Sequence, residues 1–173
     1  MYDAVPSESN YAKQFDENLR GLQKIIKDKN YRMKGEIPLL PLYDAHQTFE
    51  AKVKHFSFGS GKGLFCLTQL NQDYAFVNNK HLTYVFQGIS EDGKKYILAE
   101  FPVSVSFLPE NYHVAEFEGY SIPDNVYRDK SAQKSYEEYI VKITKRLENL
   151  PQNEFEPNLN NFEVLISSLK VEK

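Results

Sequence analysis

The chain has 173 residues, of which 41% are hydrophobic, 14% aromatic and 26% charged, and its formal net charge is −3. This length and balance are typical of one globular domain that buries a substantial core, with or without a short arm. The slightly acidic charge excludes electrostatic attraction to nucleic acid or anionic lipid, and we expect no nucleic-acid partner.

A single cysteine, Cys66, excludes an intrachain disulfide. It lies in the apolar run 64–67, where a cysteine is typically a small buried apolar residue rather than a nucleophile. No apolar run is long enough to span a membrane, and residues 1–10 show neither the basic nor the apolar region of an export signal. We therefore expect no transmembrane segment, and we expect any lipid anchor to lie outside this chain.

Residues 8–29 are predicted to form an amphipathic helix, because their apolar residues recur at helical spacing on one stripe. The stripe consists of Tyr11, Phe15, Leu19, Leu22 and Ile26. Such a stripe usually packs on its own domain, and the alternative is a helix that binds a partner or dimerises. Residues 30–45 follow as a connector, in which Pro38 and Pro41 favour an extended course and the leucines favour contact with the core.

Two strands with a glycine-rich turn are predicted next. In the strand over residues 47–58 the apolar alternation changes phase after Val53, which predicts a bulge near His55. Residues 59–63, Gly-Ser-Gly-Lys-Gly, are interpreted as a turn into a strand over residues 63–72, because they lack the glycine and lysine spacing of a phosphate-binding loop.

The best-specified element is a hairpin made of strands over residues 81–90 and 94–105. Both strands alternate with period two and are rich in aromatic and β-branched residues. Between them, Asp92 and Gly93 tolerate the positive φ angle that a tight turn requires. Pro102 has no N–H to donate, which predicts that the second strand ends there or lies at a sheet edge.

An irregular segment over residues 106–129, rich in tyrosine and phenylalanine, precedes two predicted helices. Loops of this length often bind ligands, and the aromatic residues argue against disorder. The helices are predicted over residues 131–150, with Ser131 as the N-cap, and over residues 159–169. Their seams, expected to face the core, are Tyr136, Ile140, Ile143, Leu147 and Leu150, then Leu159, Phe162, Leu165, Ile166 and Leu169.

Together these elements predict an α+β fold. We expect an antiparallel sheet of about four strands, packed by the two C-terminal helices, plus the N-terminal amphipathic helix. Residues 1–35 are assigned to an N-terminal helical arm and residues 36–173 to the α+β domain. One face of the sheet is then covered by the C-terminal helices, and the other is open to the arm, to a partner or to a neighbouring domain outside this chain.

Residues that usually carry catalysis or bind metals form no recognisable motif. The histidines, which lack the spacing of a zinc site, are His46, His55, His81 and His113. No nucleophile or nucleotide-binding signature occurs. Glu100 is the one charge within an apolar strand, and alternation places it on the more exposed face of the sheet. We therefore predict a protein that is not an enzyme and has no cofactor and no metal.

Four segments form a further pattern: IPLLPLYDAHQTF, FSFGSGKGLFCLTQL, NNKHLTYVFQGISEDGKKYILAEFPVSVSFLP and FEPNLNNFEVLISSLKV. This pattern, within residues 36–171, resembles a group of uncharacterised bacterial envelope proteins that are secreted or lipid-anchored. The residues that match are Gly59, Gly61, Gln87, Gly88, Asp92, Gly93, Tyr96, Pro102 and Pro109. Residues 62–65 depart from it, because Lys-Gly-Leu-Phe stands where many relatives have Gly-Val/Ile-Arg-Phe. The resemblance implies an extracytoplasmic location and carries no activity. In architecture alone, the predicted sheet and C-terminal helix are also similar to the Mog1/PsbP-like fold.

The expected function is a non-catalytic extracytoplasmic module that binds a protein or a cell-envelope component. The alternative is a small-molecule binding protein that uses the aromatic-rich loop 106–129 as a wall or lid. The candidate contact residues are Tyr112, Phe117, Tyr120, Tyr127 and Glu100.

Overall fold

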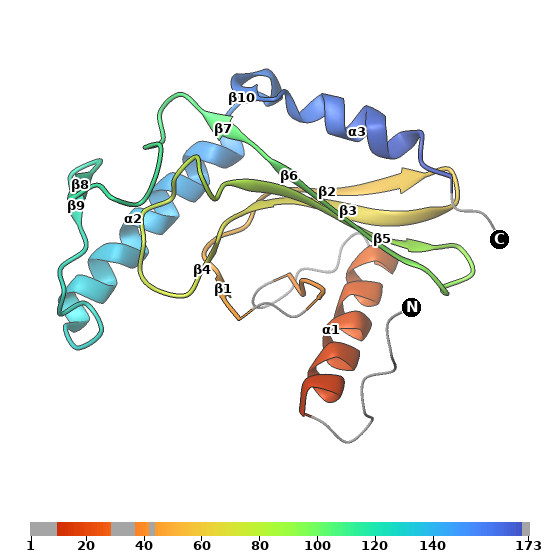
Figure 1. The fold of residues 1–173 in the computed structure, drawn as a ribbon, viewed down its shortest axis with the longest axis horizontal. Helices are drawn as coiled ribbons and strands as arrows, with labels where there is room; N and C mark the ends of the chain where they lie inside the picture. The colour runs from red at the N-terminus through yellow and green to blue at the C-terminus, as the bar shows by residue number, and fades with distance from the viewer. Residues whose placement is uncertain (1–9, 29–36, 42–43, 171–173) are drawn as a thin grey trace.

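The computed structural model describes residues 10–28, 37–41 and 44–170, and it confirms the α+β fold with a main antiparallel sheet (Figure 1). The sheet has the strand order β2-β3-β5-β6. Its strands are β2 (Ala51–Phe58), β3 (Gly61–Thr68), β5 (Thr83–Ser90) and β6 (Tyr96–Pro102). Both predicted hairpins are present, β2–β3 around the glycine-rich turn and β5–β6 around Gly93, whose φ is +71°.

Helices cover both faces of this sheet. The helices α2 (Lys130–Asn149) and α3 (Leu159–Ser167) lie on one face, and α1 (Asn10–Lys27) lies on the opposite face (Figure 1). The predicted first helix extended over residues 8–29, and its outermost positions fall outside the described residues. None of the described helices has the length and apolar character needed to cross a bilayer.

The larger core fills the space between the sheet and the helices α2 and α3. Its most buried members include Phe65, Leu67, Tyr84, Phe86, Tyr139, Ile143, Leu147, Leu159 and Ile166. A smaller core lies under α1 and contains Leu22, Ile25, Ile37, Leu40, Leu64 and Cys66. Because successive strand residues point to opposite faces, Phe65 and Leu67 enter the larger core while Leu64 and Cys66 enter the smaller one.

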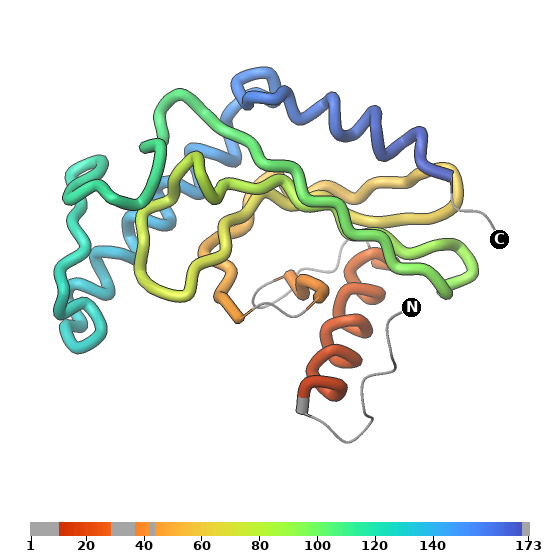
Figure 2. The backbone as a smooth tube through the Cα atoms, viewed as in Figure 1, coloured from red at the N-terminus to blue at the C-terminus, as the bar shows by residue number. Residues whose placement is uncertain are grey.

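Short antiparallel ladders surround the main sheet. They pair β1 (His46–Gln47) with β4 (Leu70–Asn71), β7 (Ser104–Val105) with β10 (Phe155–Glu156), and β8 (Glu116–Phe117) with β9 (Tyr120–Ser121). A short 3-10 helix, η1 (Gln152–Glu154), follows α2. The predicted irregular loop therefore contains the β8–β9 hairpin, and Figure 2 shows this part of the chain running beside α2.

The irregularity of β2 lies closer to its start than the sequence indicated. The register shifts between Ala51 and Lys54, so the irregularity predicted near His55 is present and ends at the residue before it. Within it Lys52 has a φ of +54°, in the left-handed region. This conformation directs Lys52 to the end of α2, where its Nζ donates to the backbone carbonyl of Glu148 at 2.6 Å. A cation at a helix C-terminus is favourable because carbonyl groups there lack helical partners.

Two details of the predicted C-terminal helices are corrected. The N-cap of α2 is Asp129 rather than Ser131, and its carboxylate accepts the backbone N–H groups of Ser131 and Ala132. Tyr139 is fully buried, although it does not belong to the predicted core-facing seam of residues 131–150. Leu165, expected in the core, is 56% exposed.

The connector lies across the sheet, as its leucines predicted for the residues that the structure describes. Ile37, Leu39 and Leu40 are buried. The side chain of Gln87 in β5 fixes this segment, because its Oε1 accepts the backbone N–H of Leu40 at 3.0 Å and its Nε2 donates to the carbonyl of Pro38 at 2.9 Å.

Strand β6 forms one edge of the main sheet. The backbone N–H of Val103 donates to the carbonyl of Leu82, and that of Ser90 donates to the carbonyl of Lys95. Successive residues of an antiparallel strand direct their N–H groups to opposite sides. Because the N–H of Val103 points toward the neighbouring strand, an N–H at residue 102 would point away from β5. This position is filled by Pro102, which confirms the prediction of an edge.

Candidate functional site

A groove with a volume of about 680 Å³ lies between the β1–β4 ladder and the first half of α2. Its lining consists of His46, Gln47, Thr48, Asn71, Gln72, Asp73, Tyr74, Tyr127, Tyr136 and Glu137. Four separate parts of the chain thus meet here: β1 and the residue after it, β4 and the turn after it, the loop before α2, and α2 itself. The volume falls within the range of small-molecule sites, about 300–1,000 Å³.

Tyrosine rings form the aromatic wall of the groove. Tyr74 contacts Tyr127 edge-to-face with the ring centroids 5.1 Å apart, and it contacts Tyr136 in the same way at 4.9 Å. Such edge-to-face pairs are the favoured geometry of aromatic rings. The hydroxyl of Tyr127 donates to Oδ1 of Asp73 at 2.7 Å, and that of Tyr136 donates to the carbonyl of Ala75 at 2.9 Å. The wall is therefore fixed at both of its ends.

Hydrogen bonds fix the amide side chains on the polar side of the groove and leave some of their donors and acceptors unused. Asn71 donates from Nδ2 to the hydroxyl of Thr48 at 2.9 Å and accepts from Gln69 at 3.0 Å. Gln72 donates from Nε2 to the carbonyl of Asp44 at 3.1 Å. An amide side chain has two N–H donors and two acceptor lone pairs, so each of these amides retains at least one donor and one acceptor that no described residue uses.

Gln47, in the lining of the groove, has a buried polar atom without a partner among the described residues. Its Oε1 accepts the backbone N–H of Ile37 at 3.0 Å. Its Nε2 is buried and has no hydrogen-bond partner among the described residues. A buried donor without a partner is uncommon in folded proteins and indicates a place that an additional acceptor would satisfy.

The tyrosines act as donors and apolar surfaces rather than as bases. Burial raises the pKa of Tyr136 to about 12. The hydrogen bond to Asp73 raises the pKa of Tyr127. Both phenols therefore remain protonated at neutral pH, which suits ligand binding and not proton abstraction.

Of the five candidate contact residues, the structure places Tyr127 in this groove. Phe117 and Tyr120 belong to the β8–β9 hairpin and pack on Tyr139 of α2, with ring centroids 6.2 and 5.5 Å away. Tyr112 lies elsewhere, stacked on His81 at 5.9 Å. Glu100 lies on β6 and is exposed, as strand alternation indicated.

The β8–β9 hairpin is held on α2 by an ion-pair cluster. Glu118 accepts contacts from Lys142 at 3.1 Å and from Arg146 at 2.7 Å. The guanidinium of Arg146 also lies over the ring of Phe107, 3.7 Å from its centroid. Most of the aromatic residues of this loop are thus used to attach it to the domain.

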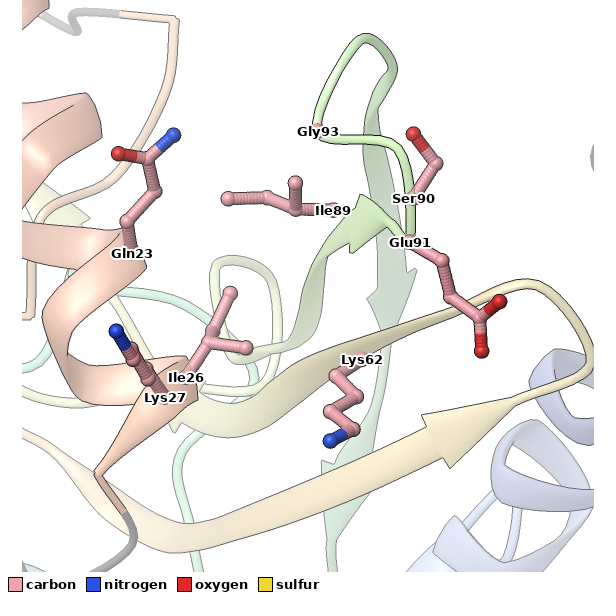
Figure 3. A pocket seen from close by; sticks show the side chains of 8 residues that line it. All are labelled: Gln23, Ile26, Lys27, Lys62, Ile89, Ser90, Glu91 and Gly93. Atoms are coloured by element: carbon pink, nitrogen blue, oxygen red, sulfur yellow. The ribbon is translucent and has the colours of Figure 1, made fainter.

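A second hollow, of about 410 Å³, lies between the end of α1 and the turns of the sheet (Figure 3). Ile26 of α1 and Ile89 of β5 face this space (Figure 3). Its buried polar residue, Ser90, is already engaged, because its hydroxyl bonds Oδ1 of Asp92 at 2.6 Å within the turn. The buried hydroxyl of this hollow is therefore already used within the turn, whereas the groove beside α2 has unused amide donors and acceptors.

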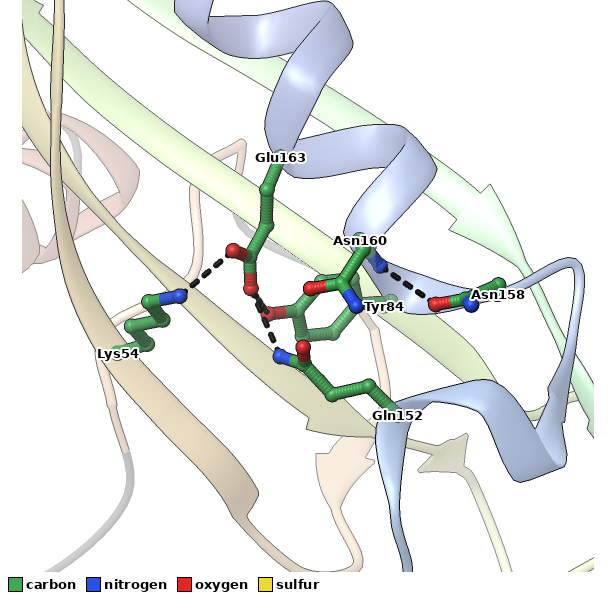
Figure 4. Close-up of polar contacts among 6 residues, drawn as sticks. All are labelled: Lys54, Tyr84, Gln152, Asn158, Asn160 and Glu163. Carbon is green, nitrogen blue, oxygen red and sulfur yellow. Dashed lines mark hydrogen bonds and ion pairs between the residues drawn. The ribbon is translucent and has the colours of Figure 1, made fainter.

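A buried carboxylate, Glu163 of α3, has partners from three other elements (Figure 4). Its oxygens accept from Lys54 at 2.6 Å, from Gln152 at 2.9 Å and from the hydroxyl of Tyr84 at 3.4 Å. Burial, followed by the charge of Glu163, raises the pKa of Tyr84. This cluster joins α3 to the sheet. Because its acceptors are satisfied, we assign it to structure and not to chemistry.

Within the described part of the chain, no group of three or more His, Cys, Asp or Glu side chains is placed to hold a metal ion. The lone Cys66 is buried under α1, and burial raises the pKa of its thiol. Comparisons with protein-family models, with curated proteins and with solved structures find no match to this chain.

The residues of the groove carried no signal in the sequence apart from Tyr127. Asn71 and Gln72 lie at the end of the predicted strand over residues 63–72, and Asp73 belongs to no predicted element. Their role depends on the β1–β4 ladder, which pairs His46 with Asn71 across the chain.

Proposed function

We propose that the protein is a non-catalytic binding module whose ligand occupies the groove beside Tyr127. The observation that supports this is the convergence of an aromatic wall with unused amide donors and acceptors in a groove of about 680 Å³. Binding sites usually combine such apolar surfaces with a few placed polar groups.

We also propose that the module acts outside the cytoplasm, in the cell envelope or secreted from it. The support is the resemblance of residues 36–171 to envelope proteins. Fractionation of cells that express the gene from its own start codon, with a C-terminal tag, tests this location. Recovery in the envelope or the medium is expected, and recovery in the cytosol contradicts it.

Docking of a partner protein is the second candidate function. It is supported by Val164 and Leu165, neighbouring apolar residues on α3 that are exposed. Isolated apolar residues are common on protein surfaces, however, and need no partner to explain them. The groove is therefore the stronger basis for a function.

Ligand-observed NMR tests the proposed binding. The probe is a panel of neutral, cationic and anionic small molecules, recorded with the wild-type protein and with Gln72→Trp, in which an indole fills the groove. Asn153→Trp, an exposed position of η1 outside the groove, is the matched control. We expect binders that the wild type and the control share and that Gln72→Trp loses. The absence of any binder, or binders that Gln72→Trp retains, would overturn the proposal.

A further inference from the structure

We infer that the ligand of the groove is a neutral, hydroxyl-rich sugar. This inference rests on the proposed function, because it names the ligand class of the same groove.

The charges of the groove disfavour an anionic ligand. Among the described residues, its lining includes the carboxylates Asp73 and Glu137 and the imidazole of His46, and no lysine or arginine. Sites for phosphates or acidic sugars normally supply a cationic side chain, usually arginine or lysine, that bonds the anion. Here a negative group would meet two like charges, which disfavours it as the occupant.

The spacing of the rings disfavours an enclosed organic cation. A cage for an ammonium group needs aromatic faces that surround the ligand. Tyr74 is instead in direct edge-to-face contact with both Tyr127 and Tyr136, at centroid distances of 5.1 and 4.9 Å. These rings fill the space between them, so no cation fits among their faces.

The same wall suits a sugar ring. Tyr127 is 58% exposed and its hydroxyl is fixed by Asp73, so that it presents a positioned aromatic surface. The C–H groups of a sugar carry partial positive charge and are attracted to the negative face of an aromatic ring.

The polar side of the groove matches hydroxyl groups. A sugar hydroxyl both donates and accepts. Counting the described residues, the amide of Asn71 retains one donor and one acceptor site, and that of Gln72 retains one donor and both acceptor sites. Gln47, which also lines the groove, has a further donor in its Nε2, a buried atom without a partner among the described residues.

Isothermal titration calorimetry with sugar trimers tests this inference. The neutral probes are trimers of glucose, galactose, mannose and N-acetylglucosamine. The charged probes are the trimer of glucosamine, which is cationic, and that of galacturonic acid, which is anionic. We expect at least one neutral trimer to bind more tightly than both charged trimers. Tyr127→Ala is expected to weaken that binding by about tenfold.

Tyr112→Ala is the matched control, because Tyr112 is a 45% exposed tyrosine of the same loop outside the groove. The inference is overturned if no neutral trimer binds, if a charged trimer binds more tightly, or if Tyr127→Ala leaves the affinity unchanged. If the glucosamine trimer binds more tightly than every neutral trimer and Tyr127→Ala weakens its binding, the neutral class of the ligand is refuted and the proposed function is left standing. The loss of all groove binding, in this test and in the NMR panel, would refute both.

Discussion

The hydroxyl of Tyr127 donates a hydrogen bond of 2.7 Å to Oδ1 of Asp73, which joins the loop before α2 to the turn after β4. Since both residues line the groove, this bond fixes the orientation of its aromatic wall. The pKa of the Tyr127 phenol therefore depends on the carboxylate of Asp73.

Replacing Asp73 by Asn tests that link. The bond raises the pKa of Tyr127, so Asp73→Asn is expected to return this pKa toward about 10. In the wild type the bond contributes to stability below the ordinary tyrosine pKa and is lost as the pH rises through the raised value. Carbon-13 NMR of labelled tyrosine rings measures the pKa, with Tyr127→Phe identifying the signal and Asp124→Asn as the control. An unchanged Tyr127 pKa in Asp73→Asn would contradict this account.

Removal of the buried carboxylate of α3 should destabilise the fold. Glu163 is 8% exposed, and Glu163→Ala leaves Tyr84 and Gln152 without their acceptor. We expect the free energy of unfolding to fall by about 2 kcal/mol. Urea denaturation measures it. Glu138→Ala, which breaks an exposed pair with Lys134 at 4.0 Å, is the control and should cost less than about 0.5 kcal/mol. Equal effects of the two variants would refute the structural role of Glu163.

The ion-pair cluster that holds the β8–β9 hairpin on α2 should weaken at acid pH. The hydrogen bond from Lys142 lowers the pKa of Glu118 below its ordinary value. A lowered pKa means that the ionised carboxylate is favoured in the folded state. Its stabilising effect is therefore present above the unfolded pKa and is lost as the pH falls through the folded pKa. An NMR titration of the Glu118 carboxyl carbon should show the lowered pKa in the wild type and a higher one in Lys142→Ala. A pKa that Lys142→Ala does not raise would show that the contact is absent in solution.

Docking of α1 should control the reactivity of Cys66. The thiol is 1% exposed beneath α1, and burial raises its pKa, so a thiol reagent should react only after local opening. Leu22→Ala removes a fully buried contact of α1 and is expected to speed the reaction at least about tenfold. Tyr11→Ala changes an exposed residue of the same helix and is the control. Equal rates in the wild type and in Leu22→Ala would show that α1 does not protect the thiol.

Local pattern and turn chemistry predicted most of the main sheet. The Asp92-Gly93 turn and the alternation on either side of it specify the β5–β6 hairpin within a few residues, and Pro102 marks its edge. These features are local, because a turn residue and its flanking alternation act on neighbouring positions of the chain.

The missed features depend on contacts between distant residues. Glu163 is buried beside Lys54, which is 109 residues away in the chain, and no spacing within α3 indicates such a partner. Similarly, Tyr139 is buried with its hydroxyl bonded to the backbone N–H of Val77 at 2.9 Å. The groove beside Tyr127 is of the same kind, since it forms only when β1 pairs with β4.

The position of Pro102 at the rim of β6 bears on how this protein behaves at high concentration. A strand from a second molecule that added itself to β6 would find no N–H at residue 102, and the rigid pyrrolidine ring would disturb its approach at this end of the strand. This single imino acid therefore disfavours the addition of a further strand at the end of the hairpin.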